Sequence, residues 1–215
     1  MVDAIIAKGV TKRFGKIFAL KNVSLTVPSG AIYCIAGPNG SGKTTLLDIL
    51  SGSRSPDSGS ASINLSIGYC HQNPLLYSDL TVHQNFILFS EMLFASQANR
   101  ESLMSLLGLG NFSSKKVLEL SSGTKKKMEL AIALLSNPEI ILLDEPTTGL
   151  DKKSVEDLLA FIRGLKGKKT LVIATHQLSD LENVATHLLV LKNGEKLSDG
   201  ELSGSLEKNY NKIIK

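Results

Sequence analysis

The sequence contains no tryptophan and only two cysteines, and its aromatic content is only 5%. So few cysteines exclude a disulfide framework or a cysteine-rich metal site as the main source of stability. We expect Cys34 and Cys70, each within an apolar segment, to be small core residues of a protein from a reducing compartment. A chain of 215 residues needs no such crosslinks, because it buries roughly 70% of its unfolded surface.

Long apolar runs are also missing. No stretch approaches the roughly 18 residues of a transmembrane helix, and the short apolar segment at residues 4–7 is not a secretory signal. We therefore expect a cytoplasmic protein. The formal net charge of +4 is a mild basic excess that suits anionic ligands and anionic membrane surfaces equally. It does not indicate a nucleic-acid partner.

A glycine-rich segment, GPNGSGKTT at residues 37–45, matches the phosphate-binding pattern G-x-x-x-x-G-K-[ST]. An apolar run at residues 31–36 precedes it and a helix-compatible run follows, which predicts a strand, a loop and a helix. Backbone N–H groups of such a loop and the positive end of the helix bind anions, and triphosphate is the ligand that fits. We expect Lys43 to reach the β- and γ-phosphates and the Thr44 hydroxyl to hold Mg²⁺. The predicted binding residues are Gly37, Pro38, Asn39, Gly40, Ser41, Gly42, Lys43, Thr44 and Thr45.

Polar side chains follow three further predicted strands. Residues 140–146 read IILLDEP, typical of a buried strand that brings Asp144 and Glu145 to the carboxyl edge of a parallel sheet. We expect Asp144 to organise Mg²⁺ through its water shell and Glu145 to act as general base or to position the attacking water. His176 follows a strand at residues 170–174, where an imidazole can bond the γ-phosphate. Gln72 follows a strand at residues 60–69 and is either a contact to Mg²⁺ or the attacking water, or a surface glutamine.

Two other segments are candidate nucleotide contacts. Phe14 precedes Gly15 in a polar stretch, and its ring either stacks on adenine or belongs to the core. Ser121, Ser122 and Gly123 precede a helix predicted at residues 125–136, so they form a second anion site at a helix N-terminus. The alternative is that Ser122 serves only as an N-cap.

The remaining pattern predicts an α/β fold. Residues 4–35 favour a small antiparallel sheet, and apolar residues crowd the span 75–94. This span begins a helical subdomain at about 75–136, and its apolar residues form either that subdomain's own core or an exposed patch for a partner. A helix at 152–165, a helix at 178–185, a strand at 187–191 and a short basic tail at 201–215 complete the chain. One domain over 1–215 results, with its nucleotide core at about 1–74 and 137–200.

The order of these motifs resembles the nucleotide-binding subunit of ABC transporters along nearly the whole chain: Phe14, GPNGSGKTT, Gln72, LSSGT, ILLDEP, the turn through Asp151, and His176. The resemblance implies a P-loop NTPase (RecA-like) fold and an ATPase that uses ATP and Mg²⁺, with Asp151 among the nucleotide-site residues. It also implies a head-to-tail homodimer or heterodimer in which residues 120–124 of one chain close over the triphosphate of the other. Gln72 then links ATP to an integral membrane permease at the inner face of the cell membrane.

Two departures from the family pattern stand out. The signature is LSGGQ in the family, whereas here Ser122 replaces the first glycine and Thr124 replaces the glutamine. We expect nucleotide binding to persist, and the serine to hinder close approach of the facing chain. Only eight residues separate Gly59 from Gly68, fewer than is usual in the family. With His71-Gln72 and residues 175–177, this makes the chain weakly similar to the ATP-binding subunits of haem exporters used in cytochrome c maturation.

Two alternatives to a transport motor follow from the same residues. One is a soluble ATP-dependent switch that acts on ribosomes or DNA, although such proteins usually carry tandem cassettes or a long coiled-coil insertion. The other is a weakly hydrolysing regulatory cassette, suggested by Ser122 and Thr124. The sequence specifies neither the transported substrate nor the direction of transport.

Overall fold

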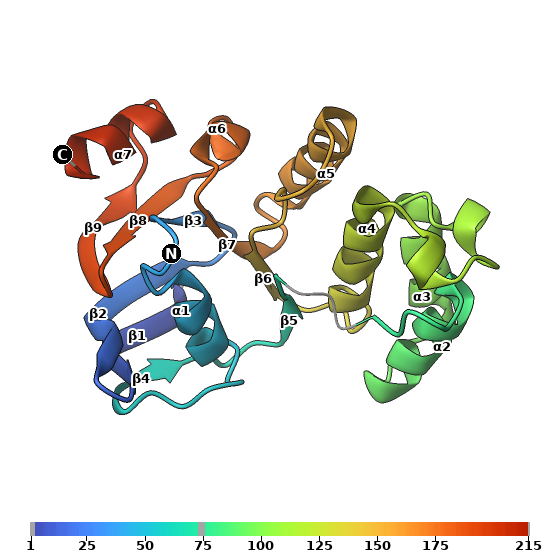
Figure 1. Cartoon of the computed structure of the whole chain (residues 1–215), viewed down its shortest axis with the longest axis horizontal. Helices are drawn as coiled ribbons and strands as arrows, with labels where there is room; N and C mark the ends of the chain where they lie inside the picture. Colours follow the sequence, from blue (N-terminus) through green and yellow to red (C-terminus); the bar gives the residue numbers. More distant parts are fainter. Residues whose placement is uncertain (1–2, 73–75, 215) are drawn as a thin grey trace.

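The computed structural model describes residues 3–72 and 76–214 and places them in two β-sheets with helices around them (Figure 1). The smaller sheet is antiparallel and has three strands in the order β2-β1-β4. Its strands are β1 (Asp3–Phe14), β2 (Ile17–Pro28) and β4 (Ser58–Ser62). Alternating apolar residues such as Val23, Leu25 and Val27 point into the core, as expected for a half-buried antiparallel sheet. The antiparallel sheet predicted from residues 4–35 is therefore present.

The larger sheet has six strands in the order β5-β6-β7-β3-β8-β9. They are β3 (Ile32–Ala36), β5 (Ile67–Cys70), β6 (Ile140–Asp144), β7 (Thr170–Thr175), β8 (His187–Lys192) and β9 (Glu195–Glu201). All pairs are parallel except β8 with β9. Every residue of β3, β6 and β7 is buried, which explains their continuous apolar sequences. The polar residues that follow β3, β5, β6 and β7 consequently meet at one edge.

The single strand predicted at residues 60–69 is wrong. The segment contributes to both sheets: in β4, Ala61 pairs with Ala7 of β1, and in β5, Gly68 pairs with Ile141 of β6. The residues between the strands cross from one sheet to the other, and the Ser66 N–H donates to Glu139 Oε2 at 3.0 Å. An alternating pattern reports which face a residue occupies and not which partner strand it pairs with.

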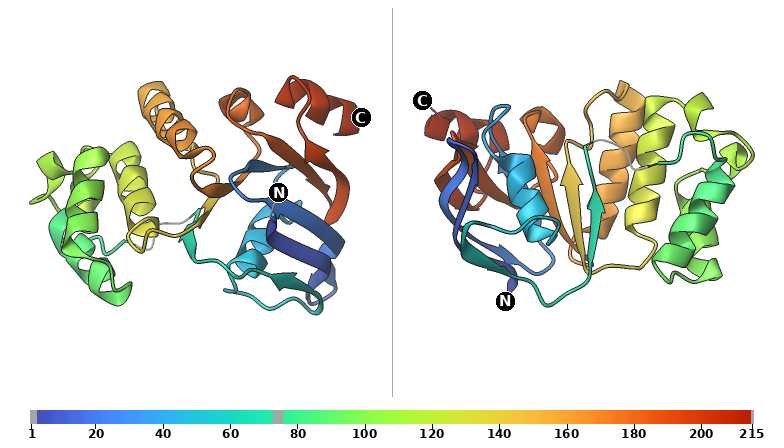
Figure 2. Two further views of the ribbon diagram at one scale, coloured as in Figure 1. Left: turned by 180° about the vertical axis from the view of Figure 1, so that it is seen from behind. Right: turned by 60° about the horizontal axis from the view of Figure 1, so that its bottom comes forward.

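Helix α1 (Lys43–Leu50) packs between the two sheets and buries Leu46, Leu47, Ile49 and Leu50. Helices α2 (Val82–Met92), α3 (Gln97–Leu106) and α4 (Ser122–Ala133) lie together beside the larger sheet, away from the antiparallel one (Figure 2). Short 3₁₀ turns at Gly110–Phe112 and Val117–Glu119 join α3 to α4. Part of the apolar span at 75–94 is core, for example Phe86, whereas Tyr77, Met92 and Phe94 are exposed. Leu75 lies outside the described residues.

Helix α5 (Lys152–Leu165) has the predicted bounds. Helix α6 (Leu178–Leu181) is shorter than the predicted 178–185, because the chain tightens after it: the Val184 N–H donates to the Leu181 carbonyl three residues before. The predicted tail is instead helix α7 (Leu206–Ile214), whose Leu206 is buried and whose Tyr210 packs on the core. No helix within the described ranges has both the length and the apolar character needed to cross a bilayer.

Candidate nucleotide-binding site

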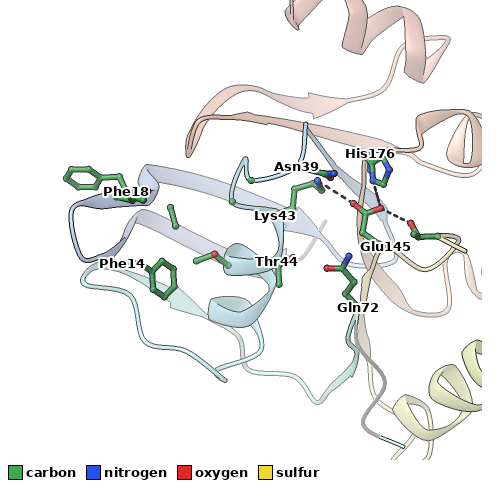
Figure 3. Close-up of a pocket in the computed structure, with 14 residues that line it drawn as sticks. Phe14, Phe18, Asn39, Lys43, Thr44, Gln72, Glu145 and His176 are labelled. Atoms are coloured by element: carbon green, nitrogen blue, oxygen red, sulfur yellow. Dashed lines mark hydrogen bonds and ion pairs between the residues drawn. The ribbon is translucent and has the colours of Figure 1, made fainter.

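A cavity of about 650 Å³ lies where the phosphate loop, the β1–β2 hairpin and the ends of β5, β6 and β7 converge (Figure 3). Its lining combines apolar groups from the hairpin with polar groups from the loop and the strand ends. The lining residues are Phe14, Ile17, Phe18, Ala19, Asn39, Gly40, Gly42, Lys43, Thr44, Thr45, Gln72, Glu145, Thr148 and His176. The cavity brings together most of the site residues predicted from sequence.

Two glycines of the phosphate loop have no room for a side chain. A Cβ at Gly37 would lie 2.3 Å from the Leu191 carbonyl oxygen, and one at Gly42 would lie 2.4 Å from the Ala19 carbonyl oxygen. Gly42 also has φ of +105°, which side-chain-bearing residues rarely adopt. Gly37, Pro38 and Ser41 belong to the loop but do not line the cavity. Glycine is therefore required at positions 37 and 42 because the backbone of Leu191 and Ala19 packs directly against them.

Helix α1 begins directly at the loop, at Lys43, and no side chain caps its N-terminus. Its first N–H groups are therefore available to an anion. The Lys43 ammonium donates to the Gly37 carbonyl at 2.9 Å and to the Pro38 carbonyl at 3.3 Å. Its side chain is only 7% exposed. The loop and the start of α1 thus place backbone N–H donors and the Lys43 ammonium next to one another.

Glu145 is the point where charged groups of the cavity meet. Its Oε1 lies 3.4 Å from Lys43 Nζ, and its Oε2 lies 2.9 Å from His176 Nδ1. The His176 N–H and the Thr148 hydroxyl also donate to Oε2, each at 3.4 Å. Glu145 has φ of +48°, an uncommon backbone conformation that is frequent at functional sites. The carboxylate is held at the end of β6 by contacts from three separate segments.

Asp144, the last residue of β6 and the neighbour of Glu145 in the chain, is fully buried. Neither carboxylate oxygen has a hydrogen-bond partner among the described residues. Burial raises the pKa of Asp144, and the neighbouring Thr44 hydroxyl opposes that shift. Unpartnered buried oxygens are costly and favour a cation or its water shell. Gln72, at the end of β5, is exposed and lines the same cavity.

Phe14 is 47% exposed and lines the cavity, so its ring is not part of the core, and its stacking on adenine stays a prediction. Sequence reasoning missed Phe18, which is 41% exposed and lines the cavity as well. The hairpin of β1 and β2 pairs Phe14 with Ile17 and Arg13 with Phe18, so the two phenylalanines occupy neighbouring positions on its two strands. The Phe14-Gly15 turn signal indicated the hairpin, but not which aromatic rings of the hairpin would line the cavity.

Ser121, Ser122, Gly123 and Asp151 lie outside the cavity. Ser121, and not Ser122, is the N-cap of α4, since its hydroxyl accepts from the Thr124 N–H at 3.2 Å. The Ser122 hydroxyl instead donates to the Gly149 carbonyl at 3.0 Å. Asp151 caps α5 by accepting from the Ser154 N–H at 3.0 Å and its hydroxyl at 2.8 Å, bonds that lower the pKa of this carboxyl. Ser121, Ser122 and Asp151 are exposed at the starts of α4 and α5, whereas Gly123 is buried against Ser154.

Both cysteines are buried, as predicted. Burial raises the pKa of the Cys34 thiol, and likewise that of Cys70, to about 12. Neither thiol lines the cavity.

Known proteins resemble this chain over nearly its whole length. The lantibiotic transport ATP-binding protein SrtF of Streptococcus pyogenes is 33% identical over 96% of each chain. The Nod factor export ATP-binding protein I of Burkholderia lata is 34% identical, covering 93% of this chain and 71% of that protein. The sulfate/thiosulfate import ATP-binding protein CysA of Mycobacterium tuberculosis is 35% identical, covering 90% of this chain and 60% of that protein.

Solved structures agree with these relatives. The ADP conformation of MJ1267, an ATP-binding cassette of an ABC transporter, has a TM-score of 0.87 at 26% identity over 100% of this chain and 98% of that one. The dimeric post-hydrolysis state of the cassette MJ0796 bound to ADP and Pi has a TM-score of 0.82 at 30% identity over 93% and 99%. These matches confirm the predicted P-loop NTPase fold.

The sequence also matches the ABC transporter family over residues 20–148, which span the phosphate loop, the signature segment and Glu145. This chain therefore belongs to the ABC transporter family and is one of its ATP-binding, ATP-hydrolysing subunits, which drive transport.

Proposed function

We propose that this subunit hydrolyses Mg²⁺-ATP in the cavity at the phosphate loop, as one of two ATP-binding subunits that drive a membrane permease. The observation that carries the proposal is the Glu145 carboxylate, held between Lys43 and His176 and next in the chain to Asp144, whose carboxylate has no hydrogen-bond partner among the described residues. One strand end thus supplies a carboxylate for the attacking water and another for a cation.

The residues present fit a magnesium ion. Asp144 supplies buried oxygens without partners, Thr44 a hydroxyl, and Gln72 an amide at the cavity wall, and oxygen ligands are those Mg²⁺ prefers. When bound, the ion offsets negative charge on the β- and γ-phosphates. Lys43 and the N-terminus of α1 bind and orient the same phosphates.

Glu145 and His176 act together on the attacking water and the γ-phosphate. The Glu145 carboxylate accepts the water's proton or orients the water, and the His176 imidazole bonds the γ-phosphate while it holds the carboxylate in place. Phe14 provides a face on which the adenine stacks.

The second subunit completes the site. Ser121, Ser122 and Asp151 are exposed outside the chain's own cavity, which supports the action of this segment, with the adjacent Gly123, on the nucleotide of a facing subunit. The similar cassette described as dimeric with ADP and Pi supports this arrangement. Gly123 packs directly on Ser154, where a Cβ would lie 2.5 Å from the Ser154 hydroxyl oxygen.

The permease is a separate integral membrane protein, and this subunit binds it at the cytoplasmic face of the membrane. Exposed Tyr77, Met92 and Phe94 on the helical region at about 75–136 are the proposed contact surface. The relatives are named for lantibiotic transport, Nod factor export and sulfate/thiosulfate import. Because these substrates differ chemically, we infer no substrate for this chain. The weak similarity to haem exporters stays a prediction, as does the assignment of residues 1–215 to one domain.

Glu145→Gln tests the mechanism. The variant keeps the size and polarity of the side chain but cannot take a proton, so we expect ATP binding to persist, hydrolysis to fall by about 10²- to 10⁴-fold, and a dimer to accumulate with ATP. The measurements are steady-state phosphate release and size-exclusion chromatography. Glu91→Gln, at an exposed position on α2, is the matched control. Wild-type hydrolysis in Glu145→Gln would contradict the proposal.

A further inference from the structure

An ion pair fixes Arg54 beside the phosphate-loop helix. Arg54 Nε and Nη2 both donate to Asp48 Oδ2 at 3.2 Å, and the Arg54 N–H donates to the Asp48 carbonyl at 3.1 Å. The Tyr69 hydroxyl donates to the other oxygen, Asp48 Oδ1, at 3.1 Å. Asp48 is part of α1 and its side chain is only 16% exposed. The guanidinium is therefore anchored to the same helix that begins at the phosphate site.

The anchored guanidinium lies over the ring of Phe14, with its Cζ 5.0 Å from the ring centroid. This is within the range of a cation–π contact, and a planar guanidinium suits such stacking better than an ammonium. Phe14 lines the nucleotide cavity (Figure 3), and Arg54 is not among the described residues that line it. The arginine thus contacts the ring from outside the cavity and leaves ring surface inside it.

We infer that Arg54 is a positioning residue for the nucleotide base: anchored by Asp48, it holds the Phe14 ring in the orientation on which the base stacks. A ring that is already ordered loses less conformational freedom when a ligand binds. The inference rests on the proposed role of Phe14, and it extends that role to two residues that do not touch the nucleotide. It predicts an effect on ligands that carry a base and no effect on ligands that consist of phosphates alone.

The experiment measures, by isothermal titration calorimetry on the full chain, the Kd for ATP and for inorganic tripolyphosphate. We expect Arg54→Gln to weaken ATP binding by about twofold to fivefold and Phe14→Ala by about tenfold or more, both with unchanged tripolyphosphate binding. Arg54→Gln added to Phe14→Ala should cause no further loss, because the ring through which Arg54 acts is gone. Asp48→Asn removes the carboxylate that anchors Arg54. This variant should also weaken ATP binding and leave tripolyphosphate binding unchanged.

Arg13→Gln is the matched control, because Arg13 lies 4.5 Å from the centroid of Phe18, the other ring of the cavity. Its ATP affinity should equal that of the wild type, and a loss as large as that of Arg54→Gln would assign the base to Phe18 and overturn the inference. An equal loss of tripolyphosphate binding in Arg54→Gln, or an additive loss in the double variant, would also overturn it. If the wild type bound neither ligand, the proposed nucleotide site itself would be wrong, which is a separate result.

Discussion

The imidazole Nδ1 of His176 lies 2.9 Å from Oε2 of Glu145. The two residues follow different strands, β7 and β6, which are hydrogen-bonded neighbours in the larger sheet. Adjacent parallel strands that end together therefore create the contact, and the positive φ of Glu145 turns its side chain toward it. The contact joins the group proposed to activate water to the group proposed to bond the γ-phosphate.

Replacement of His176 by alanine should slow hydrolysis more than it weakens binding. The Glu145 carboxylate loses its partner at 2.9 Å and the γ-phosphate loses a donor, so we expect kcat to fall by about 10²-fold with a much smaller change in the Kd for ATP. Steady-state kinetics and calorimetry measure the two quantities. His83→Ala, at an exposed position of α2, is the control. A change in Kd as large as that in kcat would instead assign His176 to ground-state binding.

Asp144→Asn should change the stability of the protein in opposite directions without and with Mg²⁺-ATP. Burial raises the pKa of Asp144, which means that its ionised carboxylate is less favourable in the folded state than in the unfolded chain. Without ligand, the variant should gain on the order of 1 kcal/mol in the free energy of unfolding. With Mg²⁺-ATP the order should reverse, because the wild type gains stability from the ion. Thermal unfolding with and without Mg²⁺-ATP tests this.

Asp79→Asn, at an exposed position, is the control for the Asp144 variant and should change neither value. An Asp144→Asn protein stabilised by Mg²⁺-ATP as strongly as the wild type would argue against the proposed cation site.

Gly123→Ala should destabilise the protein. An added Cβ would lie 2.5 Å from the Ser154 hydroxyl oxygen and 3.1 Å from Ser154 Cβ, so α4 or α5 must shift, at a cost of about 1 to 3 kcal/mol. Ser154→Gly in the same chain should restore part of the loss. Gly164→Ala within α5, where no atom lies within 4 Å of the new Cβ, should be neutral or stabilising. Chemical denaturation measures all three; equal effects at 123 and 164 would refute the packing argument.

The two thiols should resist alkylation in the folded protein. Burial raises the pKa of Cys34 and Cys70 to about 12, so neither is a thiolate at pH 8, and iodoacetamide should label them only after unfolding in urea. The unfolded chain releases these protons above about pH 8.5 while the folded chain retains them, so the free energy of unfolding should fall as pH rises beyond that value. Rapid labelling of the folded protein, followed by mass spectrometry, would contradict this.

Local chemistry made much of the site predictable. The strand, glycine-rich loop and helix at residues 31–50 follow from short-range rules, because the apolar run, the loop pattern with Lys43, and the helix-compatible run are contiguous in the chain. The carboxylates of Asp144 and Glu145 follow a buried apolar strand, and such strands end at the edge where α/β proteins bind ligands. Sequence alone therefore determined which residues of the phosphate loop and of the β6 end are candidates for the chemistry, and their order along the chain.

Tertiary structure decided which distant residues meet. Three features depend on how whole elements pack together: the division of residues 60–69 between two sheets, the placement of Phe18 at the cavity, and the contacts of Arg54 with Asp48 and Phe14. Periodicity reports the face on which a side chain lies, whereas pairing and stacking depend on the relative placement of whole elements. The phosphate end of the site was readable in nine consecutive residues, GPNGSGKTT, while the base end exists only after the hairpin folds against the helix.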